Sequence, residues 1–111
     1  MYENIYTKEQ LKDFVTYHSK SPYFFSPDTM RFFRSRLAPT FIHSGRGLIF
    51  ITSEQFVTYY PEYHIDPRKY TIRILTNDGD INEIGEFQQY DTLRQARKAA
   101  KEYAEFIHLL P

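Results

Sequence analysis

The apolar run Leu48–Ile51 places the strongest constraint on the fold. Successive side chains of a β-strand point to opposite faces of the sheet, so a run that is apolar at every position must be covered on both faces. The segments Thr40–Ser44 and Leu48–Thr52 are rich in strand-forming residues and flank Gly45-Arg46-Gly47, which predicts a hairpin. We therefore expect a central strand with helices on each side of its sheet.

Two N-terminal segments are typical of helices. Lys8–Tyr17 follows Thr7, an N-cap residue with a glutamine three positions later, as in a capping box. The short segment from Pro27 to about Ser35 follows a serine N-cap and has proline at its first position and an acidic residue in its first turn. Pro39 is then expected to break the chain.

A second hairpin and a long helix are predicted in the C-terminal half. Arg68–Leu75 alternates apolar and polar residues, which indicates a half-buried strand. A turn at 77–80 leads into a strand over Ile81–Tyr90, where Gly85 suggests a bulge or close packing. Asp91-Thr92 then caps a helix over Leu93–Leu109. Its apolar arc comprises Leu93, Ala96, Ala99, Ala100, Tyr103, Phe106, Ile107 and Leu110.

Residues 53–67 contain two prolines, four aromatic residues and no sustained period, which predicts a long aromatic loop. The chain of 111 residues is long enough for one hydrophobic core. The predicted fold class is therefore α+β, as one domain over residues 1–111. Its four-stranded antiparallel sheet consists of two hairpins, with the N-terminal helices and the long C-terminal helix packed on it.

The composition argues against several kinds of site. The chain has no cysteine, so it cannot form a disulfide or a thiolate zinc site, which fits a reducing compartment. No stretch approaches the ~18 apolar residues of a membrane span, and no basic region followed by an apolar run begins the chain. The four histidines are scattered and lack the spacing of a zinc site: His18, His43, His64 and His108.

No catalytic set emerges from the pattern. His43 and Ser44 are neighbours on a predicted strand, so their side chains point to opposite faces. Gly45 and Gly47 are explained by the hairpin turn, and no helix follows them as in a phosphate-binding loop. We expect a soluble protein that is not an enzyme and uses no metal and no cofactor.

Three groups of residues are candidates for binding. The first is arginine-rich and interleaved with aromatic residues, which suits contact with phosphates, bases or an acidic protein surface. The second consists of tyrosines in the predicted loop. The third is a basic stripe on the last helix, opposite its apolar arc. The groups are Arg31, Arg34, Arg36, Arg68 and Arg73; Tyr59, Tyr60 and Tyr63; and Arg94, Arg97, Lys98 and Lys101.

Each group also has a purely structural interpretation. The tyrosines can pack over the core as a lid, and the basic stripe can be the solvated face of its helix. Residues 74–93 carry five acidic side chains and no basic one, so the arginines can pair with them within one molecule. The formal net charge of zero and the pI near 6.9 argue against a strong general nucleic-acid binder.

Four segments resemble a group of small phage and prophage proteins of unknown function in bacteria. They are FFSPDTMRFFRSR at 24–36, FITSE at 50–54, RKYTIR at 68–73 and IGEFQQY at 84–90, and the resemblance covers roughly residues 24 to 100. Phage accessory genes often encode small proteins that bind a host protein and change its activity. The resemblance therefore implies a host-interaction protein, such as an inhibitor or a counter-defence protein, in the cytoplasm of the bacterial host cell.

Two hypotheses follow for the function. In the first, the chain is a non-enzymatic accessory protein that binds and modulates a host protein. In the alternative, it is a small nucleic-acid-binding module that uses an arginine- and lysine-rich face. No membrane partner is expected, and pairing of two copies through a sheet edge is left open.

Overall fold

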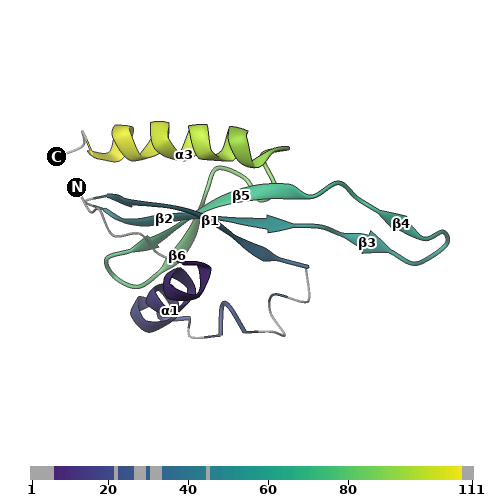
Figure 1. The fold of residues 1–111 in the computed structure, drawn as a ribbon, viewed down its shortest axis with the longest axis horizontal. Coiled ribbons are helices and arrows are strands. Elements are labelled where there is room, and N and C mark those ends of the chain that lie inside the picture. The colour runs from purple at the N-terminus through teal and green to yellow at the C-terminus, as the bar shows by residue number, and fades with distance from the viewer. Residues whose placement is uncertain (1–6, 22, 27–29, 31–33, 45, 109–111) are drawn as a thin grey trace.

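The computed structural model describes residues 7–21, 23–26, 30, 34–44 and 46–108, and arranges them in three layers (Figure 1). The middle layer is a four-stranded antiparallel sheet, with α1 (Lys8–His18) on one face and α3 (Leu93–His108) on the other. In spatial order its strands are β1 (Arg36–Ser44), β2 (Gly47–Glu54), β5 (Lys69–Thr76) and β6 (Ile81–Ile84). The α+β class, the antiparallel sheet and the packing of both helices on it are confirmed.

The apolar run of β2 is buried on both faces, as predicted. Ile49 and Ile51 face α3, where they pack with Ile72 and with three alanines of the helix. Leu48 and Phe50 face α1 and its buried residues Leu11 and Val15, with Phe25 beside them. The core is therefore divided by the sheet into two halves.

Both helices begin at the N-caps that the sequence indicates. Thr7 and Gln10 form the capping box of α1, and Thr92 Oγ1 accepts a hydrogen bond from the Gln95 backbone N–H at the start of α3, at 3.1 Å. The predicted apolar arc of α3 is wrong at Phe106, which is 60% exposed. Phe106 is therefore not part of the buried face of α3, which consists of Ala96, Ala100 and Ala104. Leu110 lies outside the described residues.

The first hairpin is longer than predicted. β1 begins at Arg36 and continues through Pro39, because it is an edge strand and its pairing with β2 is irregular between Leu37 and Phe41. The predicted helix therefore cannot reach Ser35: Arg34 has a left-handed backbone, with φ of 50°. Most of that predicted helix lies outside the described residues.

The second hairpin is confirmed, with two corrections. The prediction that β5 is half-buried was wrong, because Thr71 is buried and Arg73 is largely covered on the second face. β6 ends at Ile84 rather than Tyr90, since Gly85 takes φ of 79° and turns the chain; only a bridge between Tyr70 and Tyr90 continues the pairing.

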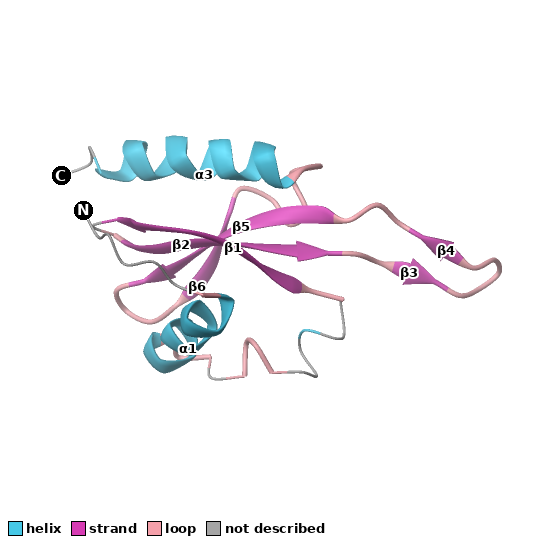
Figure 2. Ribbon diagram, in the orientation of Figure 1, coloured by secondary structure: helices cyan, strands magenta, loops and turns pink. Residues whose placement is uncertain are grey.

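The predicted long loop is in fact mostly a two-stranded arm. β3 (Val57–Thr58) pairs with β4 (His64–Ile65), and the two strands continue outward from β2 and β5 (Figure 2). Two-residue strands are too short to show the alternation by which the sequence predicts a strand. The arm lengthens the molecule, whose principal extents are 51 × 27 × 22 Å.

A bulge separates the arm from the sheet. Glu54 pairs with Lys69 in the sheet, and the Asp66 N–H donates to the Phe56 carbonyl oxygen at the base of the arm, at 2.9 Å. Between these two pairs, Gln55 alone stands opposite two residues, Pro67 and Arg68. The sheet and the arm therefore have separate hydrogen-bonding registers.

Candidate binding site

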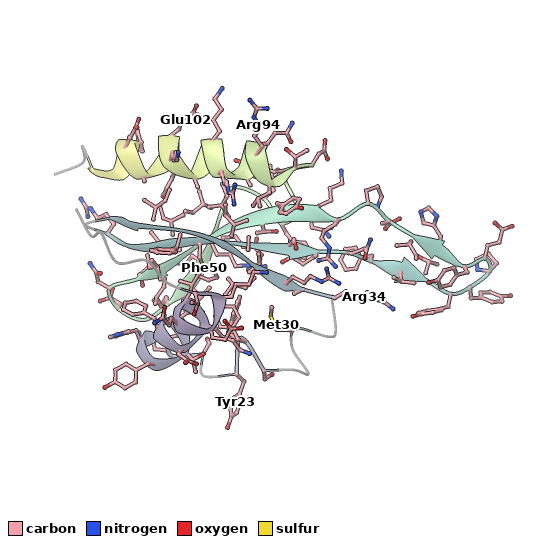
Figure 3. The ribbon with its side chains drawn as sticks, in the orientation of Figure 1. Tyr23, Met30, Arg34, Phe50, Arg94 and Glu102 are labelled. Carbon is pink, nitrogen blue, oxygen red and sulfur yellow. The ribbon has the colours of Figure 1, made fainter. Side chains whose placement is uncertain are left out.

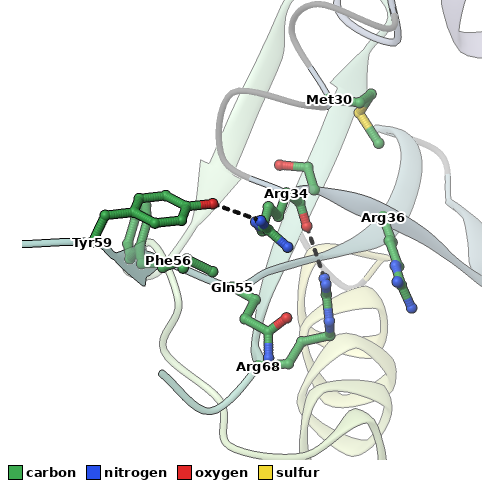
Figure 4. Close-up of a pocket in the computed structure, with 9 residues that line it drawn as sticks. Met30, Arg34, Arg36, Gln55, Phe56, Tyr59 and Arg68 are labelled. Atoms are coloured by element: carbon green, nitrogen blue, oxygen red, sulfur yellow. Dashed lines mark hydrogen bonds between the residues drawn. The ribbon is translucent and has the colours of Figure 1, made fainter. Parts of the chain in front are cut away.

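A pocket of about 650 Å³ lies where the arm joins the sheet, and three arginines line it (Figure 4). Arg34 precedes β1, Arg36 begins β1, and Arg68 lies in the bulge directly before β5. Their neighbours in the lining include Met30, Gln55 opposite the bulge, and Phe56 and Tyr59 at the start of the arm. We call this the arginine pocket. It unites three of the five arginines that the sequence singled out with one of the three tyrosines.

Local backbone geometry brings these side chains together. The left-handed conformation of Arg34 and a hydrogen bond from the Ser35 N–H to the Met30 carbonyl oxygen turn the chain into β1. Arg36 then pairs with Ser53 of β2. Bulges redirect side chains, and here the bulge provides the extra residue, Arg68, on this side of the arm.

Hydrogen bonds hold two of the arginines in place. Arg68 Nη1 donates to the Arg34 carbonyl oxygen at 3.0 Å, to the Ser53 carbonyl oxygen at 3.2 Å and to Ser53 Oγ at 3.0 Å. Arg34 Nη2 donates to the Tyr59 hydroxyl at 3.1 Å, which links the arm to the body of the protein (Figure 4). The pocket wall is therefore fixed by contacts among its own residues.

The arginine pocket carries an excess of positive charge. Its lining contains three arginines and, among the described residues, no aspartate or glutamate. Burial and the neighbouring charge of Arg36 lower the pKa of Arg68, and Arg34 acts in the same direction. Tyr70 and then Glu54 oppose this shift in the pKa of Arg68, but the Glu54 carboxylate is already held by other partners.

A second pocket, of about 350 Å³, lies on the α1 face of the sheet and shares Met30 and Ser35 with the first. Glu54 lies at this pocket and is only 1% exposed. Its carboxylate accepts hydrogen bonds from Thr52 Oγ1 at 2.8 Å and Thr71 Oγ1 at 3.0 Å, and it pairs with Arg73 Nη2 at 3.3 Å. Each carboxylate oxygen thus has a partner.

Arg73 lines this second pocket and has a structural role there. Its side chain is 13% exposed, pairs with Glu54 and with Glu83 at 3.6 Å, and lies near the rings of Phe24 and Phe87, at 5.3 and 5.9 Å from their centroids. Among the predicted binding residues that the structure describes, Arg73 is therefore the one that neutralises a buried acid.

The three predicted tyrosines lie on the arm and are exposed. Tyr60 is 87% exposed, and the rings of Tyr59 and Tyr63 are in contact, with centroids 5.6 Å apart. Ile65 of β4 is exposed beside them. The alternative in which these rings pack over the core as a lid is wrong, because the arm projects away from the sheet (Figure 1).

The basic stripe of α3 is a separate surface. Arg94, Arg97, Lys98 and Lys101 are all exposed, and the first turn of the helix contains no acidic residue. Figure 3 shows Arg94 pointing away from the sheet, on the outer side of the helix. Arg31 lies outside the described residues.

One family model matches residues 12–101 of the chain, and it describes a family of unknown function, DUF7447. The chain belongs to this family. A search of curated proteins and a search of solved structures found no significant match.

The DUF7447 match includes both pockets, the arm and the basic stripe. Other kinds of site find less support in the described part of the chain. No group of three histidine, aspartate or glutamate side chains there is arranged to hold a metal ion, and neither α1 nor α3 has the length and apolar character to cross a membrane.

Sequence reasoning singled out Arg73 but missed its buried partner Glu54, which it assigned to a loop, and the hydroxyl groups of Thr52 and Thr71 that bind Glu54. One signal was present: Thr52 and Glu54 continue the face of Leu48 and Phe50 along the same strand. A polar residue on a face that is otherwise buried predicts a polar network, because its charge must be paired there.

Proposed function

We propose that this chain is a non-enzymatic binding protein that attaches to a partner protein through its β3–β4 arm. The observation that carries the proposal is the exposure of Tyr59, Tyr60 and Tyr63 together on one projecting element. Tyrosine is enriched in protein interfaces and among the residues that dominate binding energy. The three rings are exposed on the arm and can be buried when a partner protein binds.

The arm is also anchored enough to present these rings. Val57 and Thr58 pair with Ile65 and His64, and the Arg34–Tyr59 hydrogen bond joins the arm to the body. Anchoring matters because a flexible segment loses conformational entropy when it binds, and that loss lowers affinity. Because the arm is already held in place, it loses less conformational entropy when it binds a partner.

The resemblance to phage accessory proteins supports a host protein as the partner, with inhibition or counter-defence as the outcome. On this proposal the protein acts in the cytoplasm of a bacterial host cell. Binding rather than catalysis fits the described residues, because the one buried carboxylate, Glu54, is fully engaged in its own network.

The test is capture from a lysate of the bacterium in which the gene occurs, followed by affinity measurement with the captured partner. Tyr60→Ser is expected to weaken the complex by at least 10-fold, about 1.4 kcal/mol, if Tyr60 is a dominant contact. Tyr17→Ser is the matched control, because Tyr17 is 84% exposed but lies on α1. The role of the arm would be refuted if Tyr60→Ser and Tyr17→Ser weakened the complex equally. It would also be refuted if neither Tyr60→Ser nor a triple serine variant of the arm weakened it.

Nucleic-acid binding is the second candidate, and the exposed stripe of α3 favours it. Four cations occupy one solvent-facing side of a helix whose first turn contains no acidic residue. Cations there oppose the helix dipole, so their placement costs some stability and indicates another use.

A mobility-shift titration at ~50 and ~200 mM salt tests this candidate, since contacts to phosphates weaken steeply over that range. The double variant Arg94→Glu/Lys98→Glu should abolish any shift. The control is Lys8→Glu/Lys12→Glu, which reverses two exposed charges at the same spacing on α1. Absence of binding at the lower salt concentration would eliminate this function.

A further inference from the structure

We propose that the arginine pocket binds a phosphomonoester dianion that is attached to a flat, apolar group. This inference does not depend on the role of the arm or of the basic stripe. It concerns a ligand site, and it rests on the chemistry of the pocket's two halves.

The basic half of the pocket has unused hydrogen-bond donors. Arg68 Nη1 is occupied by three acceptors, but Nε and Nη2 form no hydrogen bond within the described residues. The side chain of Arg36 likewise has neither a hydrogen bond nor an ion pair there. Nε and Nη2 lie on one edge of the planar guanidinium group, which matches two oxygens of a phosphate.

Charge favours a dianion over a single carboxylate. Arg34, Arg36 and Arg68 line one pocket, and Glu54, the carboxylate that acts on Arg68, is paired with Arg73. One carboxylate would leave this excess of positive charge largely in place. A phosphomonoester carries nearly two negative charges at pH 7 and offers three acceptor oxygens.

The pocket also has apolar side chains in its lining and is larger than phosphate alone. The cavity of about 650 Å³ is also lined by Met30, Phe56, Val57 and the ring of Tyr59. This volume falls in the usual range for small-molecule sites, in a pocket that is open to solvent and has a mixed polar and apolar lining. The ligand must therefore extend beyond its phosphate with a body that packs against these side chains.

Calorimetric titration with phenyl phosphate at constant ionic strength tests the proposal. Phenyl phosphate is expected to bind at least 10-fold more tightly than phenyl sulfate, which has nearly the same shape but one negative charge. Failure of phenyl phosphate to bind at millimolar concentration, or equal affinity for both compounds, would overturn the proposal.

Conservative variants locate the site. Arg68→Lys and Arg36→Lys keep the charge but lose the planar fork, so each should weaken phenyl phosphate at least 5-fold. Arg94→Lys on α3 should leave the affinity unchanged. Arg36→Lys is the decisive variant, because Arg36 is exposed and its loss should not disturb folding. Equal affinities for wild type, Arg36→Lys and Arg68→Lys would contradict the proposed site.

Two further titrations distinguish the possible sources of the phosphate. Adenosine monophosphate represents a nucleotide, and a peptide with phosphotyrosine represents a modified protein. Tighter binding of either compound than of phenyl phosphate, with the same loss in Arg36→Lys, supports the pocket and identifies the source. Binding of both compounds without any loss in Arg36→Lys would overturn it.

Discussion

Residues that look alike in the sequence take opposite roles once folded. Arg68 and Arg73 lie five positions apart on adjoining segments, yet Arg68 lines an open pocket and Arg73 neutralises a buried acid. The difference arises from the bulge and from strand alternation, which direct them to different faces. The sequence identified both as candidates because it shows charge and side-chain type, while the distinction depends on which acid each side chain meets.

The network of Glu54 leads to the first stability prediction. Glu54→Gln removes the charge that balances Arg73, whose side chain is itself only 13% exposed. Breaking a buried ion pair from one side typically costs 3–5 kcal/mol, so urea unfolding should show a loss of about 3 kcal/mol. Glu83→Gln is the control: Glu83 also pairs with Arg73 but is 41% exposed, and its loss should cost less than about 1 kcal/mol. Equal losses would mean that Glu54 is not the structural partner.

Gly47 lies so close to the neighbouring strand β5 that any side chain at this position would collide with its backbone. A Cβ there would lie 2.1 Å from the Leu75 carbonyl oxygen, and φ is 147°. Gly47→Ala should therefore destabilise the protein by about 2 kcal/mol, since both the contact and the conformation are strained. Thermal unfolding measures the effect, with Asp78→Ala in the exposed turn of the second hairpin as control. A melting temperature like that of the wild type would contradict the close approach of β2 and β5.

At the level of elements, the helices were the most predictable and the arm the least. The apolar period of α3 and its cap at Thr92 are local signals, and both were correct apart from the helix end. The start of β1 at Arg36 depends on pairing with Ser53 of β2, whereas β3 and β4 are close in the sequence but only two residues long each. Strands this short show no alternation of apolar and polar residues, so residues 53–67 do not predict them.

α3 owes its position to small residues. Ala96, Ala100 and Ala104 are buried against the sheet, which lets the helix pack closely on β1 and β2. Ala100→Leu should cost about 1–3 kcal/mol, because a larger side chain must displace the helix or strain the core. Glu102→Leu adds the same side chain on an exposed position and should change the free energy of unfolding by less than about 0.5 kcal/mol. Chemical denaturation of Ala100→Leu and Glu102→Leu tests whether the alanines set the distance between α3 and the sheet.

For the whole molecule, the arginine pocket exists only where three distant segments meet. Residues 34–36, 55–59 and 68 come together because Arg36 pairs with Ser53 and Glu54 pairs with Lys69. The sequence supplied the residue types of the site, but their assembly depends on the strand register. The basic stripe, by contrast, lies on one helix and was fully predictable from its period.

The arm should be separable from the stability of the fold. Replacing residues 57–65 by Asn-Gly would join Phe56 to Asp66, which are already hydrogen-bonded, through a favoured hairpin turn. Because the arm's side chains are mostly exposed, the free energy of unfolding should fall by no more than about 1 kcal/mol. Urea unfolding provides the measurement. A loss of several kcal/mol would show instead that the arm supports the core.

The bulge at Pro67 and Arg68 has a consequence for how this family can vary. Because the sheet and the arm keep separate registers, insertions and deletions within residues 57–65 need not shift any residue of the core. We therefore expect members of the family to differ in length in this segment, and to diverge there in what they recognise, while the residues before and after it change slowly. The bulge would then separate a sheet of constant length from an arm whose length and sequence vary within the family.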